Sequence, residues 1–159
     1  MKKKGAYKKN EQGPIKYIRD GRAPIPEKEI TSKIMSSIRG KDTTPEILLR
    51  KALFNNGLSG YRIHWKKIPG RPDICYPSRK VAIFVHGCYW HRCPYCKPSM
   101  PKTHVDFWKK KFKRNIKRDK RKILELENNS WEVLVFWECQ IKEDINECLR
   151  SVKKILESK

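Results

Sequence analysis

Residues 69–96 read PGRPDICYPSRKVAIFVHGCYWHRCPYC, and this stretch decides the fold. Its centre, Val81 to Val85, is a continuous run of β-branched and aromatic character, which is typical of a central strand buried on both faces. An acid opens the segment before it, and two histidines and three cysteines follow it. We therefore expect a sheet built around 81–85, with functional side chains gathered at the end of that strand.

The patterns on either side predict further elements. We expect strands over 61–65, 73–76 and 131–137, and helices over about 30–38, 45–55, 104–128 and 144–158, with a loop over 88–104. The second helix would begin at an N-cap, Thr43 or Thr44, with Pro45 as its first residue. This order favours a three-layer α/β domain with a mixed sheet.

Apolar spacing also predicts which faces of two helices are buried. For the second helix the predicted buried residues are Ile47, Leu48, Ala52 and Leu53. For the long helix they are Phe107, Trp108, Phe112, Ile116, Ile123, Leu124 and Leu126, with a row of Lys and Arg between 109 and 122 on the other face.

The charge of the chain indicates its partner. Lys and Arg total 38 against 17 acids in 159 residues, a formal net charge of +21, so nucleic acid is the leading partner. A soluble or ribosome-associated basic protein is the plainer alternative, and an anionic membrane surface fits less well because the charge is spread through the chain. We expect a flexible basic N-terminal arm over 1–26 and one domain over 27–159.

The N-terminal residues MKKKGAYKKN carry charge without an apolar segment behind them, which does not fit a secretory signal. No apolar run has the length of a membrane span. We therefore expect a cytoplasmic protein, associated with the nucleoid. In a reducing compartment, cysteines more often bind metal than form disulfides.

Four of the six cysteines are zinc candidates. Cys88, Cys93 and Cys96 form C-x4-C-x2-C, and thiolates at this spacing can close on one tetrahedral zinc with a fourth ligand from elsewhere. Cys139, just past the 131–137 strand, is the expected fourth ligand, and His91 is its competitor. A zinc with four protein ligands has no open position, so this site would be structural. The remaining pair, Cys75 and Cys148, fit buried hydrophobic positions.

A second group of residues suggests hydrolytic chemistry. Asp73 could hold Mg²⁺ against a phosphate, with the Val85 carbonyl as co-ligand, although a Pro-Asp pair is often only a turn. His86 ends the central strand and would lie at the same sheet edge. His91 could take a proton from water. Asp119 could orient that imidazole, or could be one acid on a solvated helix face.

Aromatic residues accompany this group. Tyr89 and Trp90 lie between histidine and cysteine positions, where they could stack on bases or wedge into a base stack. The alternative is that they pack over the zinc loop. Met35 could be a second wedge, although a Met at helical spacing is usually in the core. Glu46, in the first turn of the second helix, could be a surface acid that complements the helix dipole.

Taken together, GRPD (70–73), FVHGCYWHRCPYC (84–96), PKTHVDFWKKKFKRNIKRD (101–119) and WEVLVFWEC (131–139) resemble the very-short-patch mismatch repair endonucleases, the Vsr family. The resemblance covers about residues 30–139 in order. It implies a variant of the restriction-endonuclease-like fold, a structural Zn²⁺ and an Mg²⁺-dependent nick 5′ to the thymine of a T:G mismatch. Because such mismatches arise from deaminated 5-methylcytosine, it also implies a functional link to a cytosine-5 methyltransferase.

The same resemblance implies roles for individual residues. It assigns Asp73 to Mg²⁺, His91 to water activation with support from Asp119, and His86 to the active site. Other positions follow in the same way: Glu46 as an acid near the catalytic centre, Cys88, Cys93, Cys96 and Cys139 as zinc ligands, Tyr89 and Trp90 as intercalating aromatics, and Met35 as the opposing wedge. Val85 stands where Thr is common, Tyr89 where Phe is usual, and Cys93 where some members carry His.

The sequence thus predicts a monomeric DNA mismatch endonuclease that nicks double-stranded DNA. One rival is a general or structure-specific nuclease with the same catalytic centre. A second rival is a zinc-stabilised DNA-binding protein without activity, in which Asp73 would be dispensable.

Overall fold

The computed structural model describes residues 6–8, 14–16 and 40–158. Strands β1 (Ala6–Lys8) and β2 (Pro14–Lys16) pair as an antiparallel ribbon within the segment that we expected to be an arm without regular structure. The helix expected over about 30–38, and Met35 with it, lies outside the described residues.

One mixed sheet of four strands organises residues 40–158, in the order β3-β4-β5-β6. The strands are β3 (Arg62–Ile63), β4 (Ile74–Tyr76), β5 (Val81–His86) and β6 (Glu132–Trp137), and a 3-10 turn, η1 (Pro77–Arg79), joins β4 to β5. β4 runs antiparallel to both β3 and β5, whereas β5 and β6 are parallel. The predicted mixed sheet is confirmed, with 81–85 as a central strand buried along its whole length.

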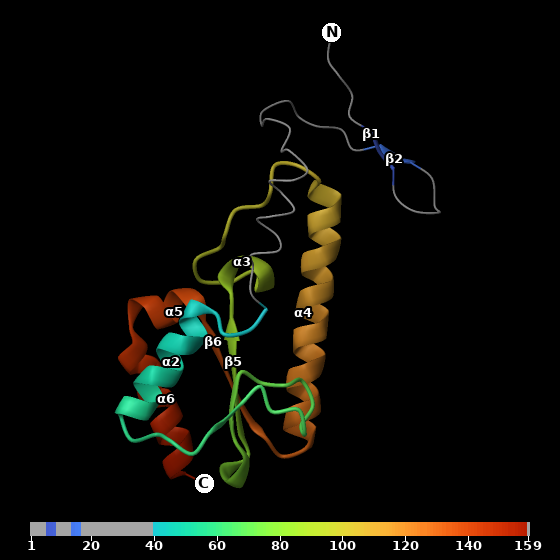
Figure 1. Cartoon of the computed structure of the whole chain (residues 1–159). Coiled ribbons are helices and arrows are strands. Elements are labelled where there is room, and N and C mark those ends of the chain that lie inside the picture. Colours follow the sequence, from blue (N-terminus) through green and yellow to red (C-terminus); the bar gives the residue numbers. More distant parts are fainter. Residues whose placement is uncertain (1–5, 9–13, 17–39, 159) are drawn as a thin grey trace.

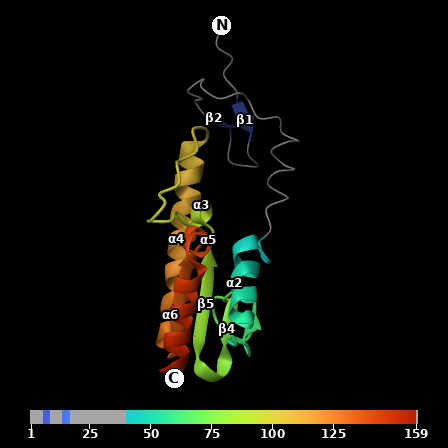
Figure 2. The same cartoon turned by 90° about the vertical axis from the view of Figure 1, so that its left-hand side faces the viewer.

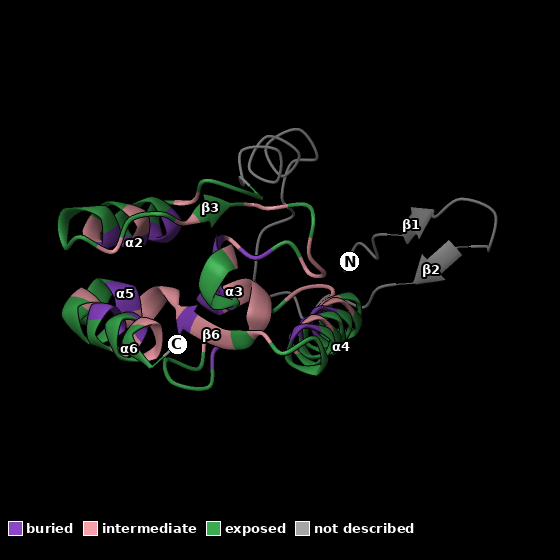
Figure 3. Ribbon diagram, turned by 90° about the horizontal axis from the view of Figure 1, so that it is seen from below, coloured by how far each residue is buried: buried purple, intermediate pink, exposed green. Residues whose placement is uncertain are grey.

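Helices cover both faces of this sheet. Three of them, α2 (Thr44–Asn55), α5 (Glu138–Glu143) and α6 (Ile145–Glu157), lie on one side, and α4 (Val105–Asn128) lies on the other (Figure 1; Figure 3). Side chains of β5 alternate between the two layers, as strand geometry requires. Val81, Ile83 and Val85 pack in the core with α2 and α6, whereas Ala82 and Phe84 pack with Leu126 of α4.

Two stretches differ from the sequence prediction. Cys88–His91 forms a single helical turn, α3, in the segment that we expected to be a loop, and it lies directly beyond the end of β5 (Figure 1; Figure 2). Cys139 lies just past β6, as expected, but within α5, a short helix that the sequence did not predict. The closing helix begins at Ile145, because the Asp144 side chain caps it by accepting from the backbone N–H groups of Asn146 and Glu147.

The predicted buried faces were partly wrong. On α2 the fully buried residues are Leu49 and Leu53, whereas Ile47 and Leu48 are exposed. On α4, Phe112 and Leu126 are buried as predicted. Phe107, Ile116 and Leu124 are exposed, since Asn115 and Asp119 occupy part of the inward face. Both polar side chains line a cleft on this side of the helix.

Among the described residues, the longest helices are too polar or too short to cross a bilayer.

Candidate active site

A cleft of about 1000 Å³ lies where β5 ends, between α2, α3 and α4. Its walls contain the six predicted catalytic or Mg²⁺-binding residues together with one of the two aromatics. These are Glu46, Asp73, Val85, His86, His91, Asp119 and Trp90. Residues from four separate segments of the chain therefore meet at one place.

The shortest contact among them joins α3 to α4. Nδ1 of His91 lies 2.5 Å from Oδ2 of Asp119. The ring of His86 stacks on that of His91, with 4.2 Å between centroids and 10° between planes. Asn115 of α4 fixes the backbone of α3 by donating to the Trp90 carbonyl at 3.1 Å. Asp119 is only 8% exposed, so the alternative of a solvated surface acid is wrong.

Burial sets the charges of this group. Burial, with a contribution from His91, lowers the pKa of His86 to about 4, so its imidazole is neutral near pH 7. Burial acts to raise the pKa of Asp119, but the hydrogen bond with His91 and nearby positive charge outweigh it, so the pKa lies below its ordinary value. The result is a carboxylate held ionised beside a histidine, the pairing that orients a general base.

Asp73 precedes β4 at the other side of the cleft. The backbone N–H of Val85 donates to its Oδ2 at 2.8 Å. Burial, opposed by that hydrogen bond and reinforced by Glu46, raises the pKa of Asp73 to about 6. Gly70 makes the preceding turn possible: its φ is +77°, and a Cβ there would approach Phe84 and Lys122 to 3.2 Å.

Glu46 is buried in the first turn of α2, so the alternative of a surface acid is wrong. Its carboxylate accepts from the Thr43 hydroxyl at 2.8 Å, the Asp42 backbone N–H at 3.0 Å and Arg50 Nη2 at 2.7 Å. These contacts fix both oxygens at the edge of the cleft.

The oxygen donors of the cleft fit a hard divalent cation. Asp73 offers a desolvated carboxylate whose ionised form is disfavoured without a nearby cation, and Glu46 adds negative charge to the same region. The structure shows Val85 bonding Asp73 through its N–H; a metal contact by its carbonyl stays a prediction.

Sequence reasoning missed His64, which lines the same cleft. Its Nδ1 lies 3.8 Å from Oδ1 of Asp73, and its Nε2 lies 3.6 Å from Oε2 of Glu46. The only sequence signal was a single histidine at the end of an apolar-polar alternation, and nothing local distinguishes that residue from a surface one.

The four predicted zinc ligands come together. Cys88, Cys93, Cys96 and Cys139 offer sulfur atoms that all lie within 4.8 Å of one another. The Sγ atoms of Cys93 and Cys139 are 3.6 Å apart, and the Cys139 backbone N–H lies 3.3 Å from Cys88 Sγ. A set of four thiols suits a structural metal site. His91 is not in this group, because it pairs with Asp119, whereas Cys75 and Cys148 are buried elsewhere, as predicted.

Tyr89 and Trp90, which follow Cys88 in α3, belong to an aromatic cluster with α4. Tyr89 contacts Trp90, Trp108 and Phe112 at centroid distances of 5.1 to 5.8 Å. Lys111 Nζ lies 5.0 Å from the Trp90 ring. Both rings are half-buried, so they pack against α4 and still present an edge to solvent.

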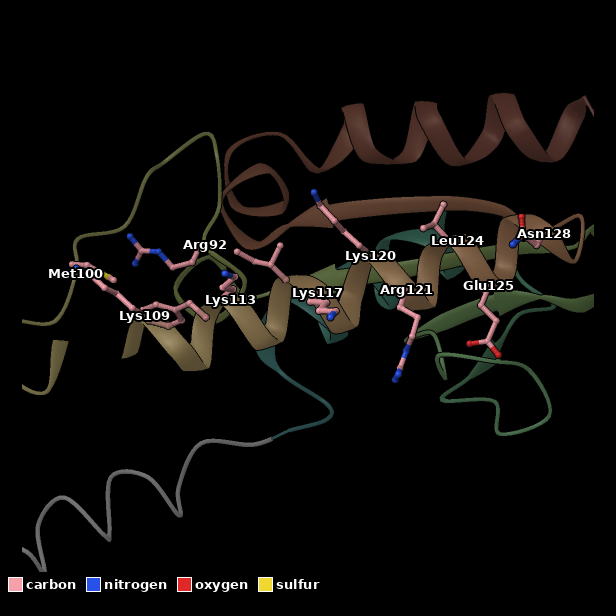
Figure 4. Close-up of a pocket in the computed structure, with 12 residues that line it drawn as sticks. Arg92, Met100, Lys109, Lys113, Lys117, Lys120, Arg121, Leu124, Glu125 and Asn128 are labelled. Atoms are coloured by element: carbon pink, nitrogen blue, oxygen red, sulfur yellow. The ribbon is translucent and has the colours of Figure 1, made fainter. Parts of the chain in front are cut away.

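A second, shallower groove follows the outer side of α4 (Figure 4). Its lining combines apolar side chains with cations: Phe112, Ile116, Leu124, Met100, Lys109, Lys113, Lys117, Lys120 and Arg121. None of these residues lines the active-site cleft, whose α4 residues are Lys111, Asn115, Arg118, Asp119 and Lys122. Helix α4 therefore presents separate basic surfaces to the cleft and to the outer groove.

The chain is similar to several known proteins. A family model described as "DNA mismatch endonuclease Vsr" matches residues 24–97. The chain is 39% identical over 110 residues to the Type II nicking enzyme V.XorIIP of Xanthomonas oryzae, covering 69% of this chain and 80% of that protein. It is 38% identical over 128 residues to V.NmeAIP of Neisseria meningitidis, covering 77% and 91%.

A third relative is the DNA mismatch endonuclease Vsr of Escherichia coli, 36% identical over 120 residues, or 76% of each chain. This alignment is long enough in both chains, and the identity high enough, to establish common descent across the domain. The chain belongs to the Vsr family of DNA mismatch endonucleases.

Proposed function

We propose that this endonuclease nicks double-stranded DNA 5′ to the thymine of a T:G mismatch. The observation that carries the proposal is the contact between His91 and Asp119, with His86 stacked on the same ring and Asp73 in the same cleft. This arrangement offers a base for water and a carboxylate for a cation beside a phosphate, as phosphodiester hydrolysis requires.

The predicted site residues of the cleft have separate roles in this proposal. Asp119 accepts from Nδ1 of His91, so Nε2 is the ring nitrogen that takes a proton from water. His86, neutral because it is buried, assists at the phosphate. Asp73, with Glu46 nearby and the Val85 carbonyl as co-ligand, would hold Mg²⁺. When bound, Mg²⁺ supplies positive charge that stabilises the charge developing on the phosphate.

The aromatic residues supply the preference for a mismatch. Tyr89 and Trp90, with Met35 as an opposing wedge, would enter the base stack beside the mismatch. Unstacking costs a few kcal/mol per step, and a mismatched step resists it less than a paired one. Lys111, over the Trp90 ring, would neutralise a nearby phosphate.

The remaining assignments follow from the family. A mixed sheet with an acid before one central strand and histidines after the next supports a restriction-endonuclease-like fold over 27–159, with Zn²⁺ on the four-cysteine cluster. Relatives named as Type II nicking enzymes support a functional link to a cytosine-5 methyltransferase. The protein would act as a monomer on nucleoid DNA in the cytoplasm.

A nicking assay tests the proposal. End-labelled duplexes with one T:G mismatch, or T:A at the same position, are incubated with wild type or Asp73→Asn in Mg²⁺ or EDTA, in several flanking contexts. We expect a nick 5′ to the T in the mismatched duplex alone, dependent on Mg²⁺ and on Asp73. Equal cutting of both duplexes would instead identify a general nuclease. Tight binding without cutting in any context would identify a binding protein.

A further inference from the structure

His64 has an unusual backbone that places its ring in the active-site cleft. It follows β3 with a φ of +45°, in the left-handed region that seven other non-glycine residues of the described part of the chain also occupy. Its backbone N–H lies 3.4 Å from the Asp73 carbonyl, so the segment stays in register with the residue that opens β4. The side chain is 17% exposed.

The ring of His64 lies among three carboxylates, those of Asp42, Glu46 and Asp73, and the guanidinium of Arg50. Nε2 lies 3.0 Å from Arg50 Nη2, and Nδ1 lies 3.8 Å from Asp73 Oδ1. Nε2 also lies 3.4 Å from Oδ1 of Asp42. The Arg50 contact is the shorter of the two, and a guanidinium has only donors, so in a neutral imidazole Nε2 accepts from Arg50. The ring proton is then on Nδ1, the nitrogen that faces Asp73.

One carboxylate oxygen of Asp73 is held by a hydrogen bond, and the other faces His64. Oδ2 accepts from the Val85 N–H at 2.8 Å, and Oδ1 faces His64. At 3.8 Å the His64 contact is electrostatic and too long for a hydrogen bond. A polarised N–H on this side favours one orientation of the carboxylate over rotation about its χ2 angle.

We propose that His64 is a positioning residue, which orients Asp73 for the divalent cation and is itself oriented by Arg50. The inference rests on the proposed function, since it assigns the cation to Asp73. Residues in contact with a metal-binding carboxylate commonly change metal affinity by about 10- to 100-fold when they are replaced.

The alternative is that Asp42, Glu46 and His64 form a cation site of their own, since their ligand atoms lie within 4.8 Å of one another. Arg50 already occupies that position: Nη1 lies 2.5 Å from Asp42, and Nη2 lies 2.7 Å from Glu46. The guanidinium thus lies against both carboxylates, where it would repel a cation placed between them. The cluster therefore supports His64 and does not compete with Asp73 for metal.

Two substitutions at His64 test the role of the ring without changing the fit of the residue to its backbone conformation. His64→Asn and His64→Gly both tolerate a positive φ, but only Asn places an amide N–H near the position of Nδ1. Thermal unfolding of the DNA-free protein is followed across a titration of MgCl₂, with Asp73→Asn as the control that loses the Mg²⁺ response. The half-saturating Mg²⁺ concentration for nicking, and KM for DNA, are measured in parallel.

We expect His64→Gly to need about tenfold more Mg²⁺ in both measurements, with KM for DNA unchanged and the Asn variant close to wild type. A Gly variant with the wild-type Mg²⁺ response would overturn the proposal. The proposal would also be overturned if His64→Gln, whose amide reaches the position of Nε2, kept the wild-type Mg²⁺ response and His64→Asn did not. If wild type shows an Asp73-dependent thermal response but nicks no duplex, the proposed function fails, and the unfolding titration still decides the role of His64.

Discussion

Nδ1 of His91 lies 2.5 Å from Oδ2 of Asp119, although 28 residues separate them in the sequence. The contact depends on two helices. One turn of helix, α3, begins directly after β5, and α4 crosses the same sheet with Asp119 on its inward face. A buried acid on that face has no value for packing, and its ionised state is stabilised by the histidine.

Replacing Asp119 should therefore impair chemistry more than binding. We expect Asp119→Asn to lower the single-turnover nicking rate on a T:G duplex by at least about 100-fold, because the His91 tautomer is no longer fixed. The dissociation constant for the duplex should change little. Asp106→Asn, an exposed acid of the same helix, is the matched control and should match wild type. A variant rate within a fewfold of wild type would show that catalysis does not need Asp119 to orient His91.

Asp73 should make the metal-free protein less stable at neutral pH. Burial raises the pKa of Asp73 in the folded protein to about 6, above its ordinary value of 3.8. Its contribution to stability is therefore fully present below pH 3.8 and is lost as the pH rises through 6. In EDTA at pH 7.5, Asp73→Asn should raise the free energy of unfolding by on the order of 2 kcal/mol. Mg²⁺ should reduce this difference in the free energy of unfolding, because it stabilises only the wild type.

Chemical denaturation of both proteins at pH 4 and pH 7.5, with and without Mg²⁺, checks this expectation. The advantage of Asp73→Asn should shrink toward pH 4, where the carboxyl of the folded wild type is protonated. An Asn variant less stable than wild type at pH 7.5 would show that the Val85 hydrogen bond outweighs the cost of burial.

The central strand was predictable because its signal is local. Val81 to Val85 is apolar at every position, and only burial on both faces satisfies such a run. Residues at its end were predictable as site residues for the same reason. His64 was not, because its partners Arg50 and Asp73 come from other elements. The exposure of Ile116 and Leu124 was missed since apolar spacing alone does not reveal that Asn115 and Asp119 face inward.

The cysteine cluster should control stability through bound metal. We expect about one zinc per chain by elemental analysis, and a lower melting temperature after dialysis against a strong chelator, because the site joins α3 to α5. Cys88→Ser should lose the zinc. Cys148→Ser, which changes a buried thiol outside the cluster, is the control and should keep it. Zinc retained by Cys88→Ser would mean that Cys88 is not a ligand.

Neighbouring cations on α4 should contribute differently to DNA binding. Arg118 lines the cleft and contacts Asp119 at 3.3 Å, whereas Lys117 lines the outer groove (Figure 4). If Arg118 meets a phosphate of the substrate, Arg118→Ala should reduce the slope of log K against log salt by about 1, and Lys117→Ala should leave it near wild type. Fluorescence anisotropy over a range of NaCl concentrations measures both slopes.

The two variants, Arg118→Ala and Lys117→Ala, also test which face of α4 contacts the substrate. Both variants remove one positive charge from adjacent residues, so a general electrostatic effect of a chain with a net charge of +21 would change the two slopes equally. A larger loss for Lys117→Ala would mean that the duplex lies along the outer groove, and it would contradict the expectation that a substrate phosphate meets Arg118 in the cleft with His91 and Asp73.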